Sequence, residues 1–468
     1  MSSIVVSPSL AGRVTLALAS ATLLAMSPRV LAAQFSNFTP LASSAVGGSL
    51  PESMPLLLSS PLFVQRTISA NDLNPLNGGV KLGDSWDMIT LNENGPLAGR
   101  YMFHPYETGA AGVKRLDLAT GQAVTIVAEG TQGFVAGDAS RWTPWGTYLT
   151  AEESWGAGST KGRLFEITNP LADVGSINFV QRNVVPRVSH EGLAFDANKS
   201  MYFIDELNGG SIFKYVSTTP NDGSTFFGAG QTFVLQVGDG TTFEGQGAAT
   251  WVAITDVNGA ALPGVPTLAD GVTVDGRAAA VVKGGTRFNR PEDIEIQTLS
   301  DGTQRIYFGT TDTHRLFSLS IGSTPSVSLF VDRNTIDAAT GLAVGNAFSN
   351  PDNVAIDALG NIYFTEDIGS IGNGGQGFDI WMATDANRDG VAERISRWAS
   401  MATVGAEPSG LYFSPFDPNV AYINAQHTGS DIDRTIMISA VPEPSTIILM
   451  AAGMAGLLLV SRSRRRVN

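Results

Sequence analysis

The chain contains no cysteine and only four histidines among its 468 residues. The absence of thiols excludes disulfide bonds, zinc fingers, thiolate catalysis and iron–sulfur clusters. Basic residues are also scarce, with 29 Lys and Arg against 43 Asp and Glu, and this acidic balance excludes a nucleic-acid binder. Hydrophobic residues make up 43%, too many for a disordered chain. What is abundant is Gly (52) and Pro (23), which favours an all-β chain of short strands and turns.

The N-terminal segment is predicted to be a secretory signal peptide. Arg13 precedes an apolar stretch over residues 14–26, and small residues at 30–33 offer a cleavage point. The stretch has no polar face, which argues against the alternative of a buried N-terminal helix. We therefore expect residues 1–32 to be removed and the protein to be exported.

The C-terminal segment, residues 441–468, combines a short motif, an apolar run and a basic end. Pro442-Glu443-Pro444 is followed by apolar residues 446–460 and by four arginines between 462 and 466, which favour a membrane segment with a cytoplasmic end. This order resembles the PEP-CTERM sorting signal of Gram-negative bacteria. The resemblance implies an exosortase as partner and membrane anchoring before C-terminal processing. It places the protein in the periplasm, at the outer surface or in an extracellular matrix with exopolysaccharide.

Residues 33–440 form the predicted folded domain, and it is strongly acidic. Without residues 1–32 and 445–468 the chain keeps 23 basic against 43 acidic residues, a formal charge of about −20. Such an excess of acid outside the cell favours calcium, a hard cation that takes about six to eight oxygen ligands.

The interior repeats a unit of short strands separated by Gly, Asp and Asn turns. Copies begin near Glu191, Pro291, Pro351 and Pro408, and weaker ones lie near Tyr101 and Trp145. Units of about 40 to 60 residues are typical of a β-propeller, and six starts predict six blades, with residues 217–285 as an insertion or a divergent blade. A β-sandwich, the alternative, would not repeat a Pro, Glu or Asp before each hydrophobic strand.

Acidic residues recur at the starts of the predicted inner strands. In a propeller these starts converge on one face of the central channel, so equivalent side chains meet there. The acidic positions are Glu152-Glu153, His190-Glu191, Glu292-Asp293, Asp352-Asn353 and Glu407. Carboxylates crowded around one axis either bind cations or have raised pKa values. Turn residues that face water are the alternative for each single position.

Several segments resemble the PhoX-type bacterial alkaline phosphatases, also described as the DUF839 family. They are residues 143–153, His190-Glu191-Gly192, residues 288–292, residues 351–363 and residues 407–429. All fall in the order of that family and span about residues 140–430. The resemblance implies a propeller that hydrolyses phosphomonoesters with calcium and iron on the channel axis.

The resemblance also implies site residues, with one departure. Glu152, Glu191, Glu292 and Asp352 are the candidate metal ligands. Ala151 stands where the family has a cysteine that ligates iron, so calcium is expected and iron is left open.

Three further residues or segments are candidates for chemistry. Arg290 is a candidate phosphate clamp, and its spacing from Glu292 puts both side chains on one face of a strand. His190 is a candidate catalytic acid or base, and the alternative is a hydrogen-bonded structural histidine. Residues 385–390 match the first half of a calcium loop, but Ser396 stands at the twelfth position, so a polar loop is the alternative to a peripheral calcium.

Two functional hypotheses follow. The first is an exported, surface-anchored phosphomonoesterase that uses axial metal ions. The second is a calcium-stabilised propeller without catalysis, which acts as an exopolysaccharide-binding or structural module of a biofilm matrix. Ala151 favours the second, and the placement of Arg290 beside Glu292 favours the first. A lactonase-like propeller with axial calcium is a weaker third alternative.

Overall fold

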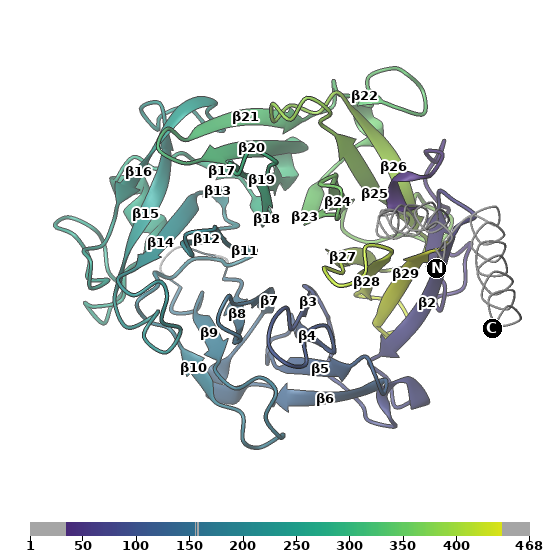
Figure 1. Ribbon diagram of the computed structural model, residues 1–468, viewed down its shortest axis with the longest axis horizontal. Helices are drawn as coiled ribbons and strands as arrows, with labels where there is room; N and C mark the ends of the chain where they lie inside the picture. The colour runs from purple at the N-terminus through teal and green to yellow at the C-terminus, as the bar shows by residue number, and fades with distance from the viewer. Residues whose placement is uncertain (1–33, 155, 157–158, 442–468) are drawn as a thin grey trace, which may run out of the picture.

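The computed structural model describes residues 34–154, 156 and 159–441. Its regular structure is almost entirely β-strand, arranged as sheets around a common centre (Figure 1). Within the described residues the helices are α1 (Gly276–Val282) and five short 3-10 turns. The 3-10 turns are η1 (Gln34–Ser36), η2 (Pro75–Asn77), η3 (Thr131–Gly133), η4 (Thr311–Thr313) and η5 (Gly345–Ala347).

Three of the sheets have four strands, and each is antiparallel between neighbours. The first contains β3 (Thr90–Leu91), β4 (Tyr101–Pro105), β5 (Val113–Asp117) and β6 (Gln122–Val127). The second contains β7 (Gly137–Trp142), β8 (Tyr148–Glu152), β9 (Leu164–Ile167) and β10 (Phe179–Gln181). The third contains β27 (Glu407–Phe413), β28 (Val420–Gln426), β29 (Arg434–Ala440) and β2 (Phe63–Ala70).

The other sheets are larger or smaller. A six-stranded sheet contains β23 (Pro351–Ile356), β24 (Ile362–Glu366), β25 (Phe378–Thr384), β26 (Arg394–Met401), β1 (Leu56–Leu58) and β22 (Ile336–Asp337). A two-stranded sheet pairs β13 (Asn208–Gly210) with β17 (Phe288–Asn289).

A nine-stranded sheet has two groups of strands. The first group is β11 (Leu193–Phe195), β12 (Met201–Ile204), β14 (Ile212–Ser217), β15 (Gly230–Val237) and β16 (Gly247–Ala253). The second is β18 (Pro291–Thr298), β19 (Gln304–Thr310), β20 (Arg315–Ile321) and β21 (Ser326–Val331). The link between the groups is short, since β16 pairs with β21 only through Gly247↔Val327 and Ala248↔Ser326.

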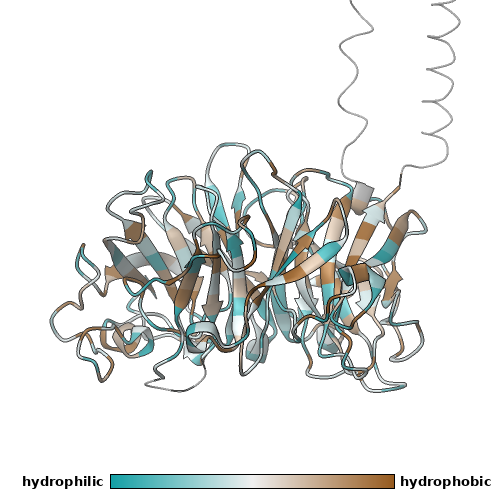
Figure 2. Ribbon diagram, turned by 90° about the horizontal axis from the view of Figure 1, so that it is seen from below, coloured by the Kyte–Doolittle hydropathy of each residue, from teal (hydrophilic) through white to brown (hydrophobic). Residues whose placement is uncertain are grey.

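The sheets pack face to face around the ring, and this explains the residue pattern of the strands. Both faces of a strand then lie against other residues, so the strand reads as a continuous apolar run and not as an alternation. All four residues of β12 are buried, as are all five of β24. Apolar clusters fill the spaces between sheets, for example Ala194, Ile204 and Leu235 of one group with Ile294 and Phe308 of the next. Seen from the side, the strands cross the thickness of the ring (Figure 2).

These observations confirm an all-β, propeller-like fold. The number of six blades stays a prediction because the sheets do not divide one to one into blades. In the described part of the chain, no helix is long and apolar enough to cross a membrane. The predicted signal peptide and the apolar C-terminal run lie outside the described residues.

Candidate functional site: an axial ring of carboxylates

The innermost strands β3, β7, β11, β18, β23 and β27 lie nearest the centre of the ring, and each pairs with the next strand of its sheet (Figure 1). This antiparallel pairing brings the start of the inner strand beside the end of its neighbour. In β7–β8, for example, Gly137 lies opposite Glu152, and in β23–β24 Pro351 lies opposite Glu366. The residues that follow these pairs, Asp138 and Glu153 in the first case, therefore come together at the centre.

A repeated backbone feature fixes this arrangement. Four side-chain-bearing residues with positive φ each stand two positions before an axial acid, namely Ser85 (φ 52°), Ala136 (φ 40°), Arg290 (φ 48°) and Asn350 (φ 44°). Their carbonyl oxygens accept hydrogen bonds, at 2.8 to 3.1 Å, from the backbone N–H of Glu107, Glu153, Thr311 and Asp367, respectively. Left-handed backbone costs a non-glycine residue roughly 1 kcal/mol or more, so the surrounding fold must impose it.

The result is a set of ten carboxylates from different sheets, which we call the axial acid ring. Its members are Asp87, Glu107, Asp138, Glu153, Glu191, Glu206, Glu292, Asp352, Asp367 and Glu407. Their charges interact across sheet boundaries. For example, the charges of Asp138, Glu292 and Asp352 raise the pKa of Glu191. Few cationic groups lie among them, the described ones being Arg290 and His427.

Burial and mutual repulsion raise the pKa values of eight of these carboxyl groups: Asp87, Asp138, Glu153, Glu191, Glu206, Glu292, Asp352 and Glu407. Burial is the largest cause for both Glu191 and Asp138, whose pKa values lie well above the ordinary range. The charge of Asp138 further raises the pKa of Glu191, and the charge of Asp87 further raises that of Asp138. Burial raises the pKa of Glu292 to about 8, although the nearby Arg290 guanidinium lowers it. Burial raises the pKa of Glu153 to about 7. A ring of this kind holds protons at neutral pH unless cations replace them.

One part of the ring gathers around Arg290. Glu191, Glu206 and Glu292 each offer a carboxylate oxygen within 4.8 Å of the others, and all three are buried. Arg290 Nη2 lies 2.7 Å from Glu206 Oε1 and 3.3 Å from Glu292 Oε1, and 28% of the Arg290 side chain is exposed. Thr311 Oγ1 donates to Glu292 Oε1. Glu206 Oε2 is buried and has no hydrogen-bond partner among the described residues.

A second group lies around His427. Its Nε2 is 3.4 Å from Glu107 Oε2 and 3.4 Å from Glu407 Oε1, and these three side chains also offer ligand atoms within 4.8 Å of one another. The hydrogen bond to Glu107 is the main cause that raises the pKa of His427 to about 8. In the nearby Asp87, Oδ1 is buried with no hydrogen-bond partner in the described chain.

The sequence-predicted ligands do not all join the ring. Glu191, Glu292 and Asp352 do, and burial and then Glu292 raise the pKa of Asp352. Glu152 does not. Its two carboxylate oxygens accept hydrogen bonds from Val135 N and Arg163 N at 3.1 Å and from the Arg163 guanidinium, so it forms a buried ion pair inside its own sheet. Its neighbour Glu153 occupies the axial position, because successive side chains of a strand point to opposite sides.

Glu366 has the same structural role as Glu152 in its own sheet. Its oxygens accept from Ser349 N, Asp379 N and Trp381 Nε1 at 2.8 to 3.2 Å. Each of these two acids thus fixes the loop before an inner strand, while the following residue reaches the axis. No sequence signal separates the two acids of Glu152-Glu153, because their difference is one of strand register.

His190 and Ala151 are both fully buried. The His190 ring packs 5.3 Å from that of Phe203, and burial together with Arg187 and Arg277 lowers its pKa to about 3. The imidazole is buried, but neither ring nitrogen has a hydrogen-bond partner among the described residues, so His190 differs from the hydrogen-bonded structural alternative. Ala151 belongs to an apolar cluster with Leu149, Val188 and Leu193.

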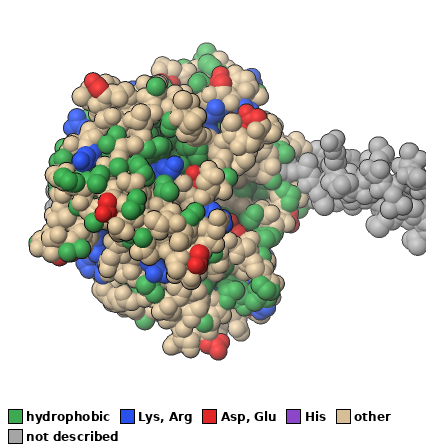
Figure 3. All heavy atoms as spheres, turned by 60° about the vertical axis from the view of Figure 1, so that its left-hand side comes forward, with side chains coloured by type: hydrophobic (Ala, Val, Ile, Leu, Met, Phe, Trp, Pro, Cys, Tyr) green, Lys and Arg blue, Asp and Glu red, His purple; other side chains and the backbone are tan. Residues whose placement is uncertain are grey.

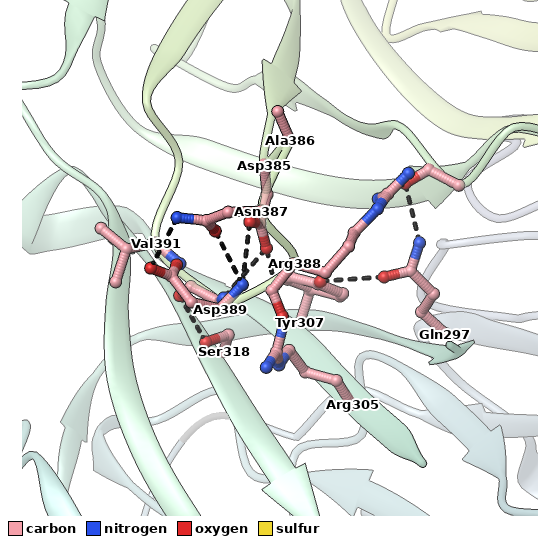
Figure 4. Close-up of polar contacts among 12 residues, drawn as sticks. Gln297, Arg305, Tyr307, Ser318, Asp385, Ala386, Asn387, Arg388, Asp389 and Val391 are labelled. Carbon is pink, nitrogen blue, oxygen red and sulfur yellow. Dashed lines mark hydrogen bonds and ion pairs between the residues drawn. The ribbon is translucent and has the colours of Figure 1, made fainter. Parts of the chain in front are cut away.

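The partial calcium loop forms a polar clamp between two sheets (Figure 4). Asp385 Oδ2 accepts from Gly390 N at 2.9 Å, and Asp389 Oδ1 accepts from Val391 N at 2.9 Å. Arg305, from β19 of the neighbouring group, donates to the carbonyl oxygen of residue 388 at 3.0 Å. Protein donors thus use these oxygens, which favours the polar-loop alternative.

Seven members of the ring were not identified as ligands from sequence: Asp87, Glu107, Asp138, Glu153, Glu206, Asp367 and Glu407. Four of them, Glu107, Glu153, Glu206 and Asp367, follow the second strand of a hairpin and not the first. A sequence signal that could have found these four acids is a pair of acidic residues in one hairpin. One acid stands at the start of the first strand, and the other directly follows the second strand.

The fold and the site together define a propeller-like protein with a buried, acidic, axial site in which Arg290 pairs with two of the carboxylates. Residues 107–341 match the family of the alkaline phosphatase PhoX, and the chain belongs to that family. Residues 440–466 match the PEP-CTERM protein-sorting motif. These matches confirm both resemblances that the sequence indicated.

A solved structure of a PhoX protein agrees with the fold. The structure of Pseudomonas fluorescens PhoX in complex with vanadate, a transition state analogue, superposes with a TM-score of 0.61 at 16% identity, over 86% of this chain and 98% of that chain. A streptogramin B lyase matches with a TM-score of 0.38 at 12% identity, over 81% and 97% of the two chains. A putative 6-phosphogluconolactonase from Bacteroides uniformis gives 0.38 at 12% identity, over 72% and 80%. No curated protein matches the chain.

Proposed function

We propose that this protein is an exported, metal-dependent phosphomonoesterase that acts at the axial acid ring. The observation that carries the proposal is the position of Arg290 between the buried carboxylates Glu206 and Glu292. A purely structural cation site has no use for a partly exposed guanidinium at its edge. A phosphomonoester needs both components, because its oxygens are charged and its transition state spreads charge over them.

The residues of the ring fit a hard cation. The candidate metal-ligand atoms grouped near Arg290 are carboxylate oxygens. Buried oxygens of Glu206 and Asp138 lack a hydrogen-bond partner among the described residues. Oxygen ligands without thiolate suit calcium better than iron, and the absence of any cysteine removes the family's thiolate ligand. We assign Glu191, Glu206, Glu292 and Asp352 as the holders of the metal, with Glu153 in place of Glu152.

The metal, when bound, supplies positive charge that polarises the phosphoryl group and activates an oxygen nucleophile. Arg290 binds and orients the phosphoryl oxygens through its planar fork of N–H donors. Glu206 and Glu292 hold that guanidinium in place, and Thr311 in turn orients Glu292 by its hydrogen bond. Vanadate, bound by the related Pseudomonas protein as a transition state analogue, has the chemistry that such a site would recognise.

The two terminal segments determine the cellular location of the proposed activity. The sorting motif implies export and processing at the C-terminus by an exosortase. We assign residues 1–32 to a signal peptide, 33–440 to the propeller and 441–468 to the sorting and anchoring segment. Dividing the nine-stranded sheet at the short β16–β21 contact gives a propeller of six blades.

Elemental analysis of the purified exported protein, together with hydrolysis of p-nitrophenyl phosphate, tests the proposal. We expect bound calcium and a phosphatase activity that a chelator removes and calcium restores. The matched variants are Glu191→Gln, inside the ring, and Glu129→Gln, elsewhere in the chain. The first should lose metal and activity together, and the second should keep both. Bound calcium without hydrolysis would contradict the phosphatase proposal and favour the non-catalytic matrix module. A protein without bound metal would contradict both hypotheses.

A further inference from the structure

The opposite end of the inner strands carries a second site. Strand β18 begins at the acid ring with Glu292, and three and four residues later Glu295 and Ile296 line a cavity of about 290 Å³. A second cavity of about 350 Å³ shares Ile296 and Ile356 with the first. The two cavities are therefore adjacent, and together we call them the distal groove. It leads from the ends of β18, β23 and β27 outward between β18 and β23.

The charged groups of the distal groove are already paired within the protein. Arg141 Nη2 contacts Glu295 Oε1 at 2.6 Å, and Tyr412 Oη donates to Glu93 Oε1 at 2.8 Å. In the outer part, Arg388 Nη1 donates to the carbonyl oxygen of Gly360 at 2.6 Å. Each of these charged side chains thus has an ion-pair or hydrogen-bond partner, so the groove has no strong requirement for a ligand of either sign. It still offers many hydrogen-bond donors and acceptors at fixed positions.

Apolar side chains form the walls between these polar groups. Ile296 and Ile356, at the junction of the two cavities, and Phe413, at the inner end, are all partly exposed. The outer half continues with the polar residues Gln297 and Thr298 and with Arg388, which Figure 4 shows beside Gln297. Each cavity lies near the lower end of the about 300–1,000 Å³ typical of ligand sites, so a ligand that fills both is extended.

We infer that the distal groove binds a neutral oligosaccharide. A sugar chain presents hydroxyl groups, which both donate and accept, around faces made of C–H groups, and this alternation matches paired polar groups set between apolar walls. On the face that Figure 3 draws, Lys, Arg, Asp and Glu are spread among other side chains. The inference is independent of the phosphatase proposal, because it uses the other end of the inner strands.

Isothermal titration of the exported protein with a panel of neutral gluco-, manno- and galacto-oligosaccharides, from trisaccharides to hexasaccharides, tests the inference. We expect at least one series to bind, with affinity rising with chain length. Ile356→Trp, which narrows the junction of the two cavities, should abolish binding of the longer members. Tyr412→Phe, which removes one hydroxyl group, should weaken binding about five- to tenfold.

The matched control is Tyr422→Phe. Tyr422 lies opposite Tyr412 in the β27–β28 register but lines a different groove, so its variant should bind sugars as the parent does. All three variants should keep their phosphatase activity and melting temperature. Binding that survives Ile356→Trp, binding of charged saccharides or peptides alone, or no binding at millimolar concentration would overturn the inference.

Discussion

Glu152 and Glu153 are adjacent in the chain but belong to different networks. Glu152 is fully buried and paired with Arg163, and Glu153 lies at the axis, where Glu206 and Glu107 act on it. One carboxylate stabilises the sheet, and the other adds to a repulsive cluster. The same division holds for Glu366 and Asp367.

This division predicts opposite effects of one substitution at neighbouring positions. Glu152→Gln leaves the buried Arg163 without a charged partner and should lower the free energy of unfolding by about 3 kcal/mol. Glu153→Gln should leave that free energy unchanged or raise it in metal-free protein, but weaken calcium binding and activity. Thermal unfolding and calcium titration of both variants check this. Equal destabilisation by the two changes would contradict the register described here.

Arg290→Lys tests the phosphate clamp. A lysine keeps the charge between Glu206 and Glu292 but loses the planar fork, so we expect kcat/KM for p-nitrophenyl phosphate to fall about 100-fold or more with metal content unchanged. Vanadate inhibition should weaken in parallel. Arg315→Lys, at the outer ion pair with Glu244, is the control and should be active. Full activity of the Arg290→Lys variant would show that Arg290 does not bind the substrate.

Removing the metal should make the folded protein more stable as the pH falls from 8.5 to about 6.5. The pKa of Glu292 in the folded chain is about 8, above the ordinary carboxyl value, so its protonation favours folding. That contribution is complete below the ordinary pKa and is lost as pH rises through 8. Chelated protein should therefore become more stable from pH 8.5 down to about pH 6.5.

Below about pH 6.5, His104 and His190 have the opposite effect on stability. Burial lowers their pKa values, so the folded protein loses stability as the pH falls further. Calcium-loaded protein should show no such gain, because protons compete with the metal. Melting temperatures measured across this range with and without chelator separate the two cases. A metal-free protein that loses stability between pH 8.5 and 6.5 would contradict the raised pKa values.

Lys114 is a buried cation outside the site. It is fully buried, with Nζ 3.0 Å from the centre of the Trp86 ring and 3.3 Å from Thr435 Oγ1, and burial lowers its pKa well below the ordinary value. Lys114→Met removes the cost of burying an amine and should raise the free energy of unfolding by about 1–3 kcal/mol. Denaturant unfolding measures it, with the less buried Lys214→Met as control. Loss of stability would show that the contact with Trp86 outweighs that cost.

The C-terminal segment should serve placement and not activity. A chain that ends at Glu443 lacks the apolar run and the arginines, so we expect it in the soluble exported fraction with full phosphatase activity. Cell fractionation with an activity assay checks this. Retention of the shortened chain in the membrane fraction would show that another part of the protein anchors it.

Much of the fold could be predicted because its units repeat. Runs such as Ile362-Tyr363-Phe364, bounded by Asp and Gly turns, recur along the chain and become strands buried on both faces. The division into blades could not be predicted as well, because it depends on pairing between distant segments. The β16–β21 contact, which joins two groups, leaves no mark in local sequence.

The site was predictable in kind but not in every residue. Acids at inner strand starts, such as Glu191 and Glu292, could be found from the repeat. Glu206 and Asp367 could not, because they join the site only after a hairpin brings a second strand end to the axis. The placement of Glu152 outside the ring could not be predicted for a related reason: side-chain direction at a strand end depends on register, which composition does not encode.

The pairing of β2 with β29 joins residues 63–70 to residues 434–440. The ring therefore cannot close until the last strand of the domain is available, and an early folding intermediate lacks one of its walls. For a chain exported while unfolded, closure must wait until almost all of the domain has crossed the membrane. Under the proposed export and metal binding, folding is then completed on the far side of the membrane, where a cation can neutralise the acids at the axis as the ring closes.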